Sequence, residues 1–320
     1  MSPNFDRSLI GLSGPEFRVP LEAGKIGEFA RATYSSHPDY FRQQAPLMPA
    51  TFLASAGYAF GYTLERPGDT PLRRLGLENA STLDAEIGFR FHGRLPRAGA
   101  ALTAATRIAD MFEKTGARAG RMLFWKALTE FHDEAGRAAA EFFTTSVLPE
   151  RMPAMQVEGL MPPEERPSFE QDIGAALMSA IRPLGQGVLS VKDGPGELSF
   201  PPLTLTEILR YQAASSDLNL IHHDENFARR HGYPTVISVG LLHIGALATY
   251  ATNWLGPDNI RSLRARVLSI NWPGDRLRYA GTVSRLYEEG GERKVDLALS
   301  CTRHTGERTL DVSITFVMPA

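Results

Sequence analysis

The chain has 320 residues, of which 43% are hydrophobic and 22% are charged, and its formal net charge is −2. This length is sufficient for two domains, and the composition is that of an ordinary globular protein. A charge so close to neutral excludes the basic surface typical of nucleic-acid-binding proteins. The single cysteine, Cys301, excludes an intramolecular disulfide framework and fits a reducing, cytoplasmic location.

Neither of the usual membrane signals is found in the sequence. The first residues, MSPNFDRSLIGL, lack the basic start and apolar core of a signal peptide. No apolar run reaches the roughly 18 residues that cross a bilayer. The nearest run, 236–251, is interrupted by Ser238 and His243. We therefore expect no membrane partner.

The first half of the chain is expected to place its helices before its strands. A short strand and turn lead into a helix over residues 25–33, and the small apolar residues of 49–62 favour a second helix. Alternating hydrophobicity then predicts four strands. These strands lie within 85–91, 102–108, 122–131 and 138–148.

The same order repeats after a proline-rich linker. The linker, 151–185, includes a short helix over 170–183. A strand at 188–191, a helix from Thr206 and a buried helix over 236–254 are expected next. Four strands follow, near 263–270, 277–287, 294–303 and 309–317. We interpret the chain as a duplicated α+β unit, with repeats at 1–150 and 186–320.

One motif in the second repeat carries candidate chemistry, the segment Asp217-Leu-Asn219-Leu-Ile-His222. Its carboxylate and imidazole can meet if the backbone between them turns, and Asn219 favours such a turn. Together, the two groups can hold a water molecule and move its proton. Further along, Gly240 lies near the start of the apolar helix, where free amides could hold an oxygen that becomes negative.

This pattern resembles the hydratase motif of MaoC-like enzymes, which include (R)-specific enoyl-CoA hydratases and 3-hydroxyacyl thioester dehydratases. The positions that match are, in order, Asp217, Asn219, His222, Asp224, Ala228, Gly232, Tyr233, Pro234 and Gly240. The resemblance implies a double hot-dog fold, in which each repeat wraps a curved antiparallel sheet around one long apolar helix. The substrate implied is an acyl-CoA or acyl carrier protein thioester, and no cofactor or metal is implied.

The resemblance also implies a role for individual residues. Asp217 and His222 would bind and activate water, while the amide of Gly240 would lie in the oxyanion hole and Asn219 beside it in the substrate site. The sequence departs from the family pattern at Leu220, where Pro is usual, and at Ser216, where Gly is common. Ser238-Val239 also replaces the frequent Ala-His.

The first repeat is expected to be catalytically silent. Alignment of residues 29–33 with 211–215 places Ser35 opposite Asp217 and Tyr40 opposite His222, so the acid–base pair is missing there. The resemblance implies that this half forms the tunnel for the acyl chain. The two repeats already supply the family's pairwise arrangement, and further assembly into a homodimer stays open.

Two other functions remain open for the second repeat. His222 and Asp224, together with the distant His304, could imitate the facial triad of a non-haem iron enzyme. Alternatively, the protein could be a subunit that binds acyl thioesters without reacting. Of the neighbouring groups, His223 is expected to be solvated, Asp224 to lie in a surface turn, and His243 to be a core residue with its hydrogen bonds satisfied.

Overall fold

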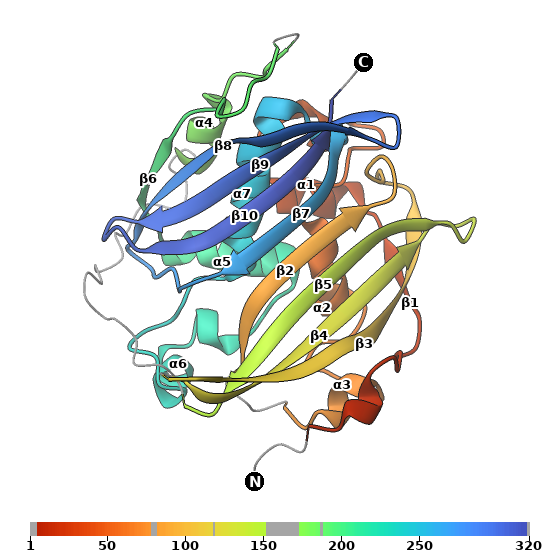
Figure 1. The fold of residues 1–320 in the computed structure, drawn as a ribbon, viewed down its shortest axis with the longest axis vertical. Coiled ribbons are helices and arrows are strands. Elements are labelled where there is room, and N and C mark those ends of the chain that lie inside the picture. The colour runs from red at the N-terminus through yellow and green to blue at the C-terminus, as the bar shows by residue number, and fades with distance from the viewer. Residues whose placement is uncertain (1–4, 78–81, 118, 152–172, 186–187, 319–320) are drawn as a thin grey trace.

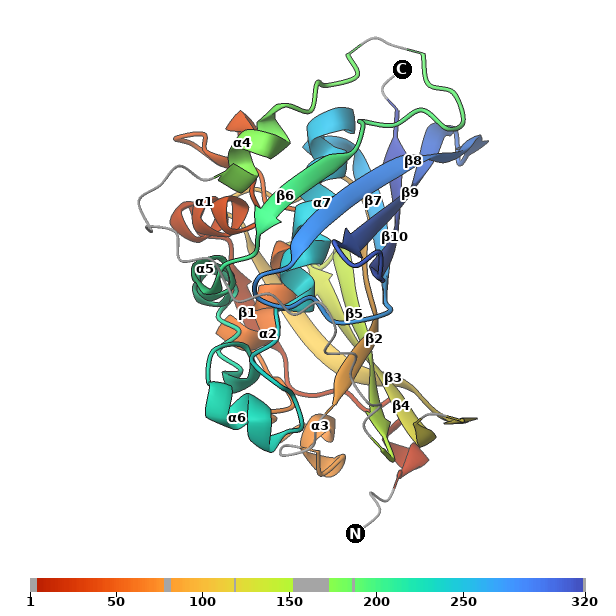
Figure 2. The same cartoon turned by 90° about the vertical axis from the view of Figure 1, so that its left-hand side faces the viewer.

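The computed structural model describes residues 5–77, 82–117, 119–151, 173–185 and 188–318. Within them the strands form a single antiparallel sheet, and the helices gather on one side of it (Figures 1 and 2). Strands β1–β5 come from the first half of the chain: Phe17–Pro20, Leu83–Phe91, Ala101–Gly116, Gly120–His132 and Ala138–Pro149. Strands β6–β10 come from the second half: Leu198–Pro202, Ile260–Val267, Arg276–Glu289, Glu292–Arg303 and Arg308–Val317.

The order of the strands reveals the duplication. Across the sheet it reads β1-β3-β4-β5-β2-β7-β10-β9-β8-β6. Adding five to each strand number of the first half gives the order of the second half, read from the opposite edge. The halves meet where β2 pairs with β7, from Glu86 opposite Arg266 to Arg90 opposite Ser262. Two equivalent five-stranded units are thus joined edge to edge, which confirms the predicted duplicated α+β unit.

Seven helices occur among the described residues. They are α1 (Ala23–Ala32), α2 (Ser55–Ala59), α3 (Pro71–Arg74), α4 (Ile173–Ser179), α5 (Leu205–Ser215), α6 (Glu225–Arg230) and α7 (Gly240–Leu255). Short 3₁₀ turns precede or link them, including Phe52–Ala54 before α2 and Leu220–His222 before α6. No described helix is both long and apolar enough to cross a bilayer.

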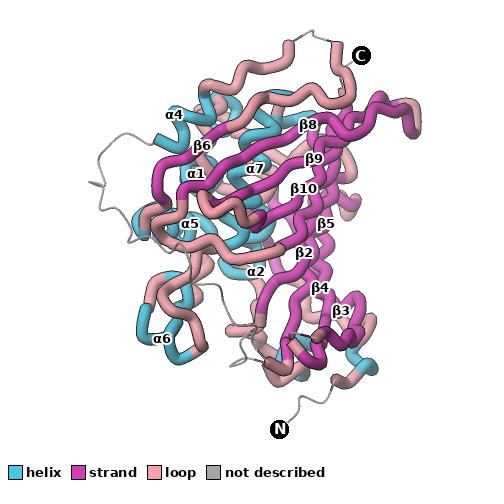
Figure 3. The backbone as a smooth tube through the Cα atoms, turned by 60° about the vertical axis from the view of Figure 1, so that its left-hand side comes forward, coloured by secondary structure: helices cyan, strands magenta, loops and turns pink. Residues whose placement is uncertain are grey.

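Helix α7 fills the centre of the molecule (Figures 2 and 3). Every residue from Leu241 to Leu255 is buried. The helix is apolar on all sides, as expected of a helix with no face toward solvent. Its side chains belong to one hydrophobic core that includes residues from both halves of the chain, such as Phe52 and Phe131 from the first and Leu299 from the second.

The structure corrects three details of the sequence prediction. In the first repeat, the helical segment equivalent to α7 is short: the 3₁₀ turn 52–54 and α2 end at Ala59, before Gly61 and the loop that follows. Residues 188–191 form no strand, and β6 lies at Leu198–Pro202 instead. Helix α7 starts at Gly240, because residues 236–239 are not helical and the backbone of Val239 is extended. The expected linker falls largely on residues 152–172, outside the described part of the chain.

Close packing between the repeats is concentrated at one glycine of α7. A Cβ atom at Gly245 would lie 2.6 Å from Thr33 Cγ2 and 3.1 Å from Thr51 Oγ1. Thr33 ends α1, and its hydroxyl donates a hydrogen bond to the Phe29 carbonyl, so this side chain is held in place. The first repeat therefore approaches the central helix at a distance that only glycine allows.

We expect Gly245→Ala to lower the free energy of unfolding by about 1–3 kcal/mol, because overpacking outweighs the better helix propensity of alanine. Thr33→Ser removes the methyl group that clashes and should restore most of the loss in the double variant. Urea unfolding of the four proteins of this cycle measures the effect. Gly24→Ala is the control, because a Cβ there meets nothing within 4 Å. Additive losses in the double variant would contradict this packing account.

Candidate active site

The motif begins where α5 ends. Thr204 and Glu207 form a capping box at the start of the helix, in which Thr204 Oγ1 accepts from the Glu207 amide at 3.2 Å and Glu207 Oε2 accepts from the Thr204 amide at 2.8 Å. The helix stops at Ser216, whose φ of +62° lies in the left-handed region. Glycine adopts this conformation most readily, and serine occupies it here with its backbone strained.

The chain then turns as the motif predicted. Asp217 Oδ1 accepts a hydrogen bond from the Asn219 amide at 3.2 Å, and Asn219 Oδ1 accepts from the Ile221 amide at 3.1 Å. These successive side-chain-to-backbone bonds bend the segment into the 3₁₀ turn that ends at His222. Both Asp217 and His222 therefore line one cavity of about 550 Å³.

Gln212 holds this turn against α5, a role that the sequence did not reveal. Its Nε2 donates to the carbonyl oxygens of Asp217, at 2.9 Å, and Asn219, at 3.1 Å. Its Oε1 lies 3.0 Å from Nδ1 of His223, which is exposed as expected. A polar side chain on the buried face of an amphipathic helix was the available signal, since Gln212 is only 1% exposed.

His222 is held in one orientation and one tautomer. Its Nδ1 lies 2.9 Å from the carbonyl oxygen of Ile237, so this nitrogen carries the proton and donates it. The other ring nitrogen, Nε2, then has a free lone pair. Burial lowers the pKa of His222 to about 4, because the charged imidazolium would lose its water. The ring is therefore neutral, and able to accept a proton, at physiological pH.

Asp217 is shifted in the opposite direction. Its side chain is 4% exposed, and burial raises its pKa to about 7, with the negative charge of Glu65 adding to the effect. The hydrogen bond from the Asn219 amide opposes this rise. The carboxyl can therefore hold a proton near neutral pH. A pair whose pKa values are pushed apart in this way consists of a ready acid and a ready base.

Helix α7 presents its first amides to the same cavity. Gly240 lines it, and a Cβ atom there would meet nothing within 4 Å, so the helix start is open. The amides of Gly240 and Leu241 donate to no acceptor among the described residues. Unpaired amides at the positive end of a sixteen-residue helix dipole are suited to bind an anionic oxygen.

Residues of the first repeat complete the surroundings of the pair. Glu65 Oε1 accepts a hydrogen bond from Asn219 Nδ2 at 3.2 Å, which ties the loop after α2 to the motif. Tyr58 of α2 lines the cavity, and its pKa is raised well above the usual value, first by the charge of Asp217 and then by burial. Ser35 and Tyr40, which alignment placed opposite the pair, are buried in the core and do not line the cavity.

The remaining candidate groups serve other purposes. Asp224 caps α6 by accepting from the Phe227 amide, and His304 lies 3.5 Å from Asp275. The iron triad is therefore not assembled, and no three histidine, cysteine or acidic side chains in the described residues could together hold a metal ion. His243 is a core residue with both nitrogens paired, 2.7 Å from Ser238 Oγ and 3.1 Å from the Tyr279 hydroxyl.

Two family models match the chain, one to each half. The model described as "FAS1-like, dehydratase domain region" matches residues 8–142, and the model described as "MaoC like domain" matches residues 194–303. The chain belongs to the MaoC-like dehydratase family. No curated protein matches its sequence.

Solved structures of similar shape agree with this MaoC-like architecture. A MaoC-like dehydratase superposes with a TM-score of 0.74 at 18% identity, over 98% of this chain and 99% of its own. A MaoC-like dehydratase from Phytophthora capsici gives a TM-score of 0.66 at 15% identity, over 99% and 100%. A conserved hypothetical protein from Mycobacterium tuberculosis, described as a double hotdog fold, gives 0.61 at 14%, over 98% of each. The fold of this MaoC-like protein is thus the double hot-dog predicted from its motif.

We expect Asp217→Asn to stabilise this MaoC-like protein in alkaline buffer. The pKa of Asp217 rises from 3.8 to about 7 on folding, so its favourable contribution is complete below pH 3.8 and is lost as the pH rises through 7. Asparagine cannot ionise. The variant should therefore exceed the wild type by about 2–4 kcal/mol in free energy of unfolding at pH 8, and by little at pH 4.

Urea unfolding at the two pH values measures this difference, with Asp110→Asn on the exposed surface of β3 as the matched control. An advantage of the same size at both pH values would show that the Asp217 carboxyl has an ordinary pKa.

Proposed function

We propose that the protein is a hydro-lyase that reversibly hydrates a trans-2-enoyl thioester to the 3-hydroxyacyl thioester. The observation that supports this most directly is the pair of opposed pKa shifts, about 4 at His222 and about 7 at Asp217, on two groups lining one cavity. Hydration needs a base that takes a proton from water and an acid that gives one to carbon. The pair supplies both without a cofactor.

The first step uses His222. With Nδ1 donating to the Ile237 carbonyl, Nε2 accepts a proton from a water molecule in the cavity. The water oxygen forms a bond to the β-carbon as that proton leaves. The π electrons of the carbon–carbon double bond move toward the thioester, whose oxygen becomes negative.

The second step uses α7 and Asp217. The free amides of Gly240 and Leu241 stabilise the negative thioester oxygen, an effect worth a few kcal/mol in other enzymes. Protonated Asp217 then delivers its proton to the α-carbon, which completes the 3-hydroxyacyl product. Proton transfer from His222 back to Asp217 restores the starting state. Asn219 holds the Asp217 carboxyl in place through its amide hydrogen bond.

The carrier of the acyl group is CoA or an acyl carrier protein, and the product is the (R)-3-hydroxyacyl form. Both statements are supported by the match of the Asp217–Gly240 segment to the hydratase motif and by membership of the MaoC-like family. The alternative is a subunit that binds acyl thioesters without reacting. The opposed pKa shifts favour the enzyme, because binding alone does not need an acid and a base lining the same cavity.

Substitution of either member of the pair should abolish activity. We expect Asp217→Asn and His222→Ala each to lower kcat/KM for crotonyl-CoA hydration by at least about 100-fold, the usual contribution of a positioned acid or base. Loss of absorbance of the enoyl thioester measures the rate. Asp110→Asn, at an exposed position of β3 that does not line the cavity, is the control. An inactive wild-type protein that still binds acyl-CoA would instead support the non-catalytic alternative.

The hydration rate should depend on pH in a way that follows from the two pKa values. Asp217 must be protonated, so kcat/KM should fall as the pH rises above about 7. His222 must be neutral, so kcat/KM should also fall below about pH 4. A pH profile of kcat/KM from about 3 to about 9 measures both limbs. A rate that instead increases through pH 7 would mean that ionised Asp217 is the active form.

A further inference from the structure

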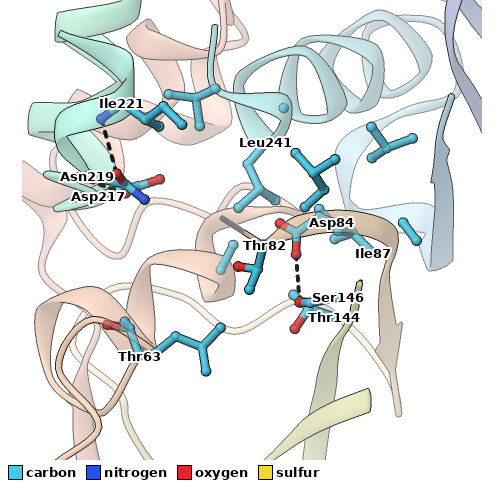
Figure 4. A pocket seen from close by; sticks show the side chains of 18 of the residues that line it. Thr63, Thr82, Asp84, Ile87, Thr144, Ser146, Asp217, Asn219, Ile221 and Leu241 are labelled. Atoms are coloured by element: carbon cyan, nitrogen blue, oxygen red, sulfur yellow. Dashed lines mark hydrogen bonds between the residues drawn. The ribbon is translucent and has the colours of Figure 1, made fainter. Parts of the chain in front are cut away.

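The wall that the first repeat contributes to the cavity is polar. Side chains with hydroxyl or carboxyl groups lie next to one another on four neighbouring strands, and we call them the polar strip: Asp84 on β2, Thr144 and Ser146 on β5, Thr129 on β4 and Thr106 on β3. Register places Asp84 opposite Ser146, and Thr106 opposite Thr129. Figure 4 shows Asp84, Thr144 and Ser146 at the cavity, across from Asp217.

The polar strip differs from a sheet face covered by a helix, which carries apolar side chains. Strands β9 and β10 are the counterparts of β4 and β5 in the second repeat. They carry these buried aliphatic residues: Val295, Leu297, Leu299, Leu310, Val312 and Ile314. Those residues pack in the core beneath α7. In the first repeat the helix ends at Ala59, so the inner face of β2–β5 is left to line a cavity.

Two groups of the polar strip, among the described residues, form no hydrogen bond with another protein group. The Thr106 and Thr129 hydroxyls pair with each other at 2.8 Å, and Ser146 Oγ donates to Asp84 Oδ1 at 2.9 Å. Among the described residues, the second carboxyl oxygen of Asp84 and the hydroxyl of Thr144 form no hydrogen bond with another protein group, and neither side chain is buried. An alkyl chain along this wall would separate them from water and satisfy neither, which is unfavourable for any buried polar group.

Asp84 is the strongest acceptor of the polar strip. Its side chain lines the cavity and is exposed, and the protein groups packed around it raise its pKa to about 6, chiefly by desolvation. The negative charges of Asp217 and Glu65 add to this rise, so Asp84 lies close enough to Asp217 for the two carboxyl groups to affect each other's charge. A hydrogen-bond donor on the ligand would relieve the desolvation of this carboxyl.

We propose that the acyl group of the substrate carries a hydroxyl substituent beyond the reacting carbons, and that the polar strip binds it. This inference rests on the proposed hydration of an enoyl thioester. The hydroxyl donates to the free oxygen of Asp84 and accepts from Thr144. A cavity of about 550 Å³ encloses an acyl group of moderate length, while the bulk of CoA or of a carrier protein stays outside.

The test compares matched substrates. Wild-type kcat/KM is measured for trans-2-octenoyl-CoA and for the same thioester with a hydroxyl at carbon 5, 6, 7 or 8. We expect at least one hydroxylated substrate to exceed the alkyl substrate by about 10-fold or more, because a site built for a hydroxyl rejects the analogue without it. Equal values for the whole series overturn the inference and leave the proposed hydration intact.

Variants assign the preference to the polar strip. Asp84→Leu should reduce the ratio of hydroxylated to alkyl kcat/KM to within about threefold of unity, while Asp84→Asn and Thr144→Val should lower it less. Thr103→Val and Asp110→Asn, on exposed positions of β3, are matched controls that should keep the wild-type ratio. If Asp84→Leu lowers kcat/KM equally for the hydroxylated and the alkyl substrate, the strip binds the pantetheine arm of the carrier, and the inference is wrong.

Binding of the same thioesters, measured by calorimetry, separates the two proposals. If no thioester is hydrated but the hydroxylated ones still bind about 10-fold more tightly than the alkyl one, the polar strip holds and the hydro-lyase proposal fails. Circular dichroism of each variant establishes that it is folded. If hydroxylated and alkyl thioesters bind and react equally well at every hydroxyl position, the inference about the polar strip is wrong and the hydro-lyase proposal is unaffected.

Discussion

The structure depends on how two helices of unequal length, α7 and α2, cover one face of a continuous sheet. Ten strands from both repeats form a single surface through the pairing of β2 with β7, and α7 buries all but its first residue beneath it. Its counterpart in the first repeat ends after Ala59. The sheet is therefore covered on one half and incompletely covered on the other, and the uncovered part becomes the cavity.

Burial at the edge of this cavity shifts the pKa values of the pair. Asp217 and His222 would have similar, ordinary environments in an unfolded chain, in which both would be ionised near pH 5. Desolvation favours the neutral form of each, which raises the pKa of the acid and lowers that of the imidazole. The same force thus prepares a proton donor and a proton acceptor, and it opposes folding at pH values where either group must carry charge.

The division of labour between the repeats follows from their local sequences. The second repeat contributes the turn, the pair and the amides of α7, whereas the first contributes Tyr58, Glu65 and the polar strip. The first repeat was expected to form an apolar tunnel for an acyl chain. Its wall does carry apolar groups, such as Ile87 and Phe142, but Asp84 and the threonines lie among them. This half lacks the pair and supplies a large part of the cavity wall.

The sequence by itself determined most of the secondary structure and the family. Period-two hydrophobicity identified eight of the strands, because each has one face on the core. Seven agree within three residues at both ends, whereas β3 continues to Gly116, eight residues past its predicted end. The spacing of Asp217, Asn219 and His222 located the turn, because its hydrogen bonds are local. Local signals failed at 188–191, where an apolar run forms no strand, and at β6, whose short segment gains its pairing only from β8.

Tertiary structure alone decided the rest. The opposed pKa values arise from desolvation by residues far apart in the chain, and the local sequence does not predict them. The same holds for Gln212, whose amide reaches across a turn, and for Asp84, which meets the site only because β2 lies beside β5. Local hydrogen bonds and periodicity are written in the sequence, whereas burial and electric fields depend on which distant segments the fold brings together.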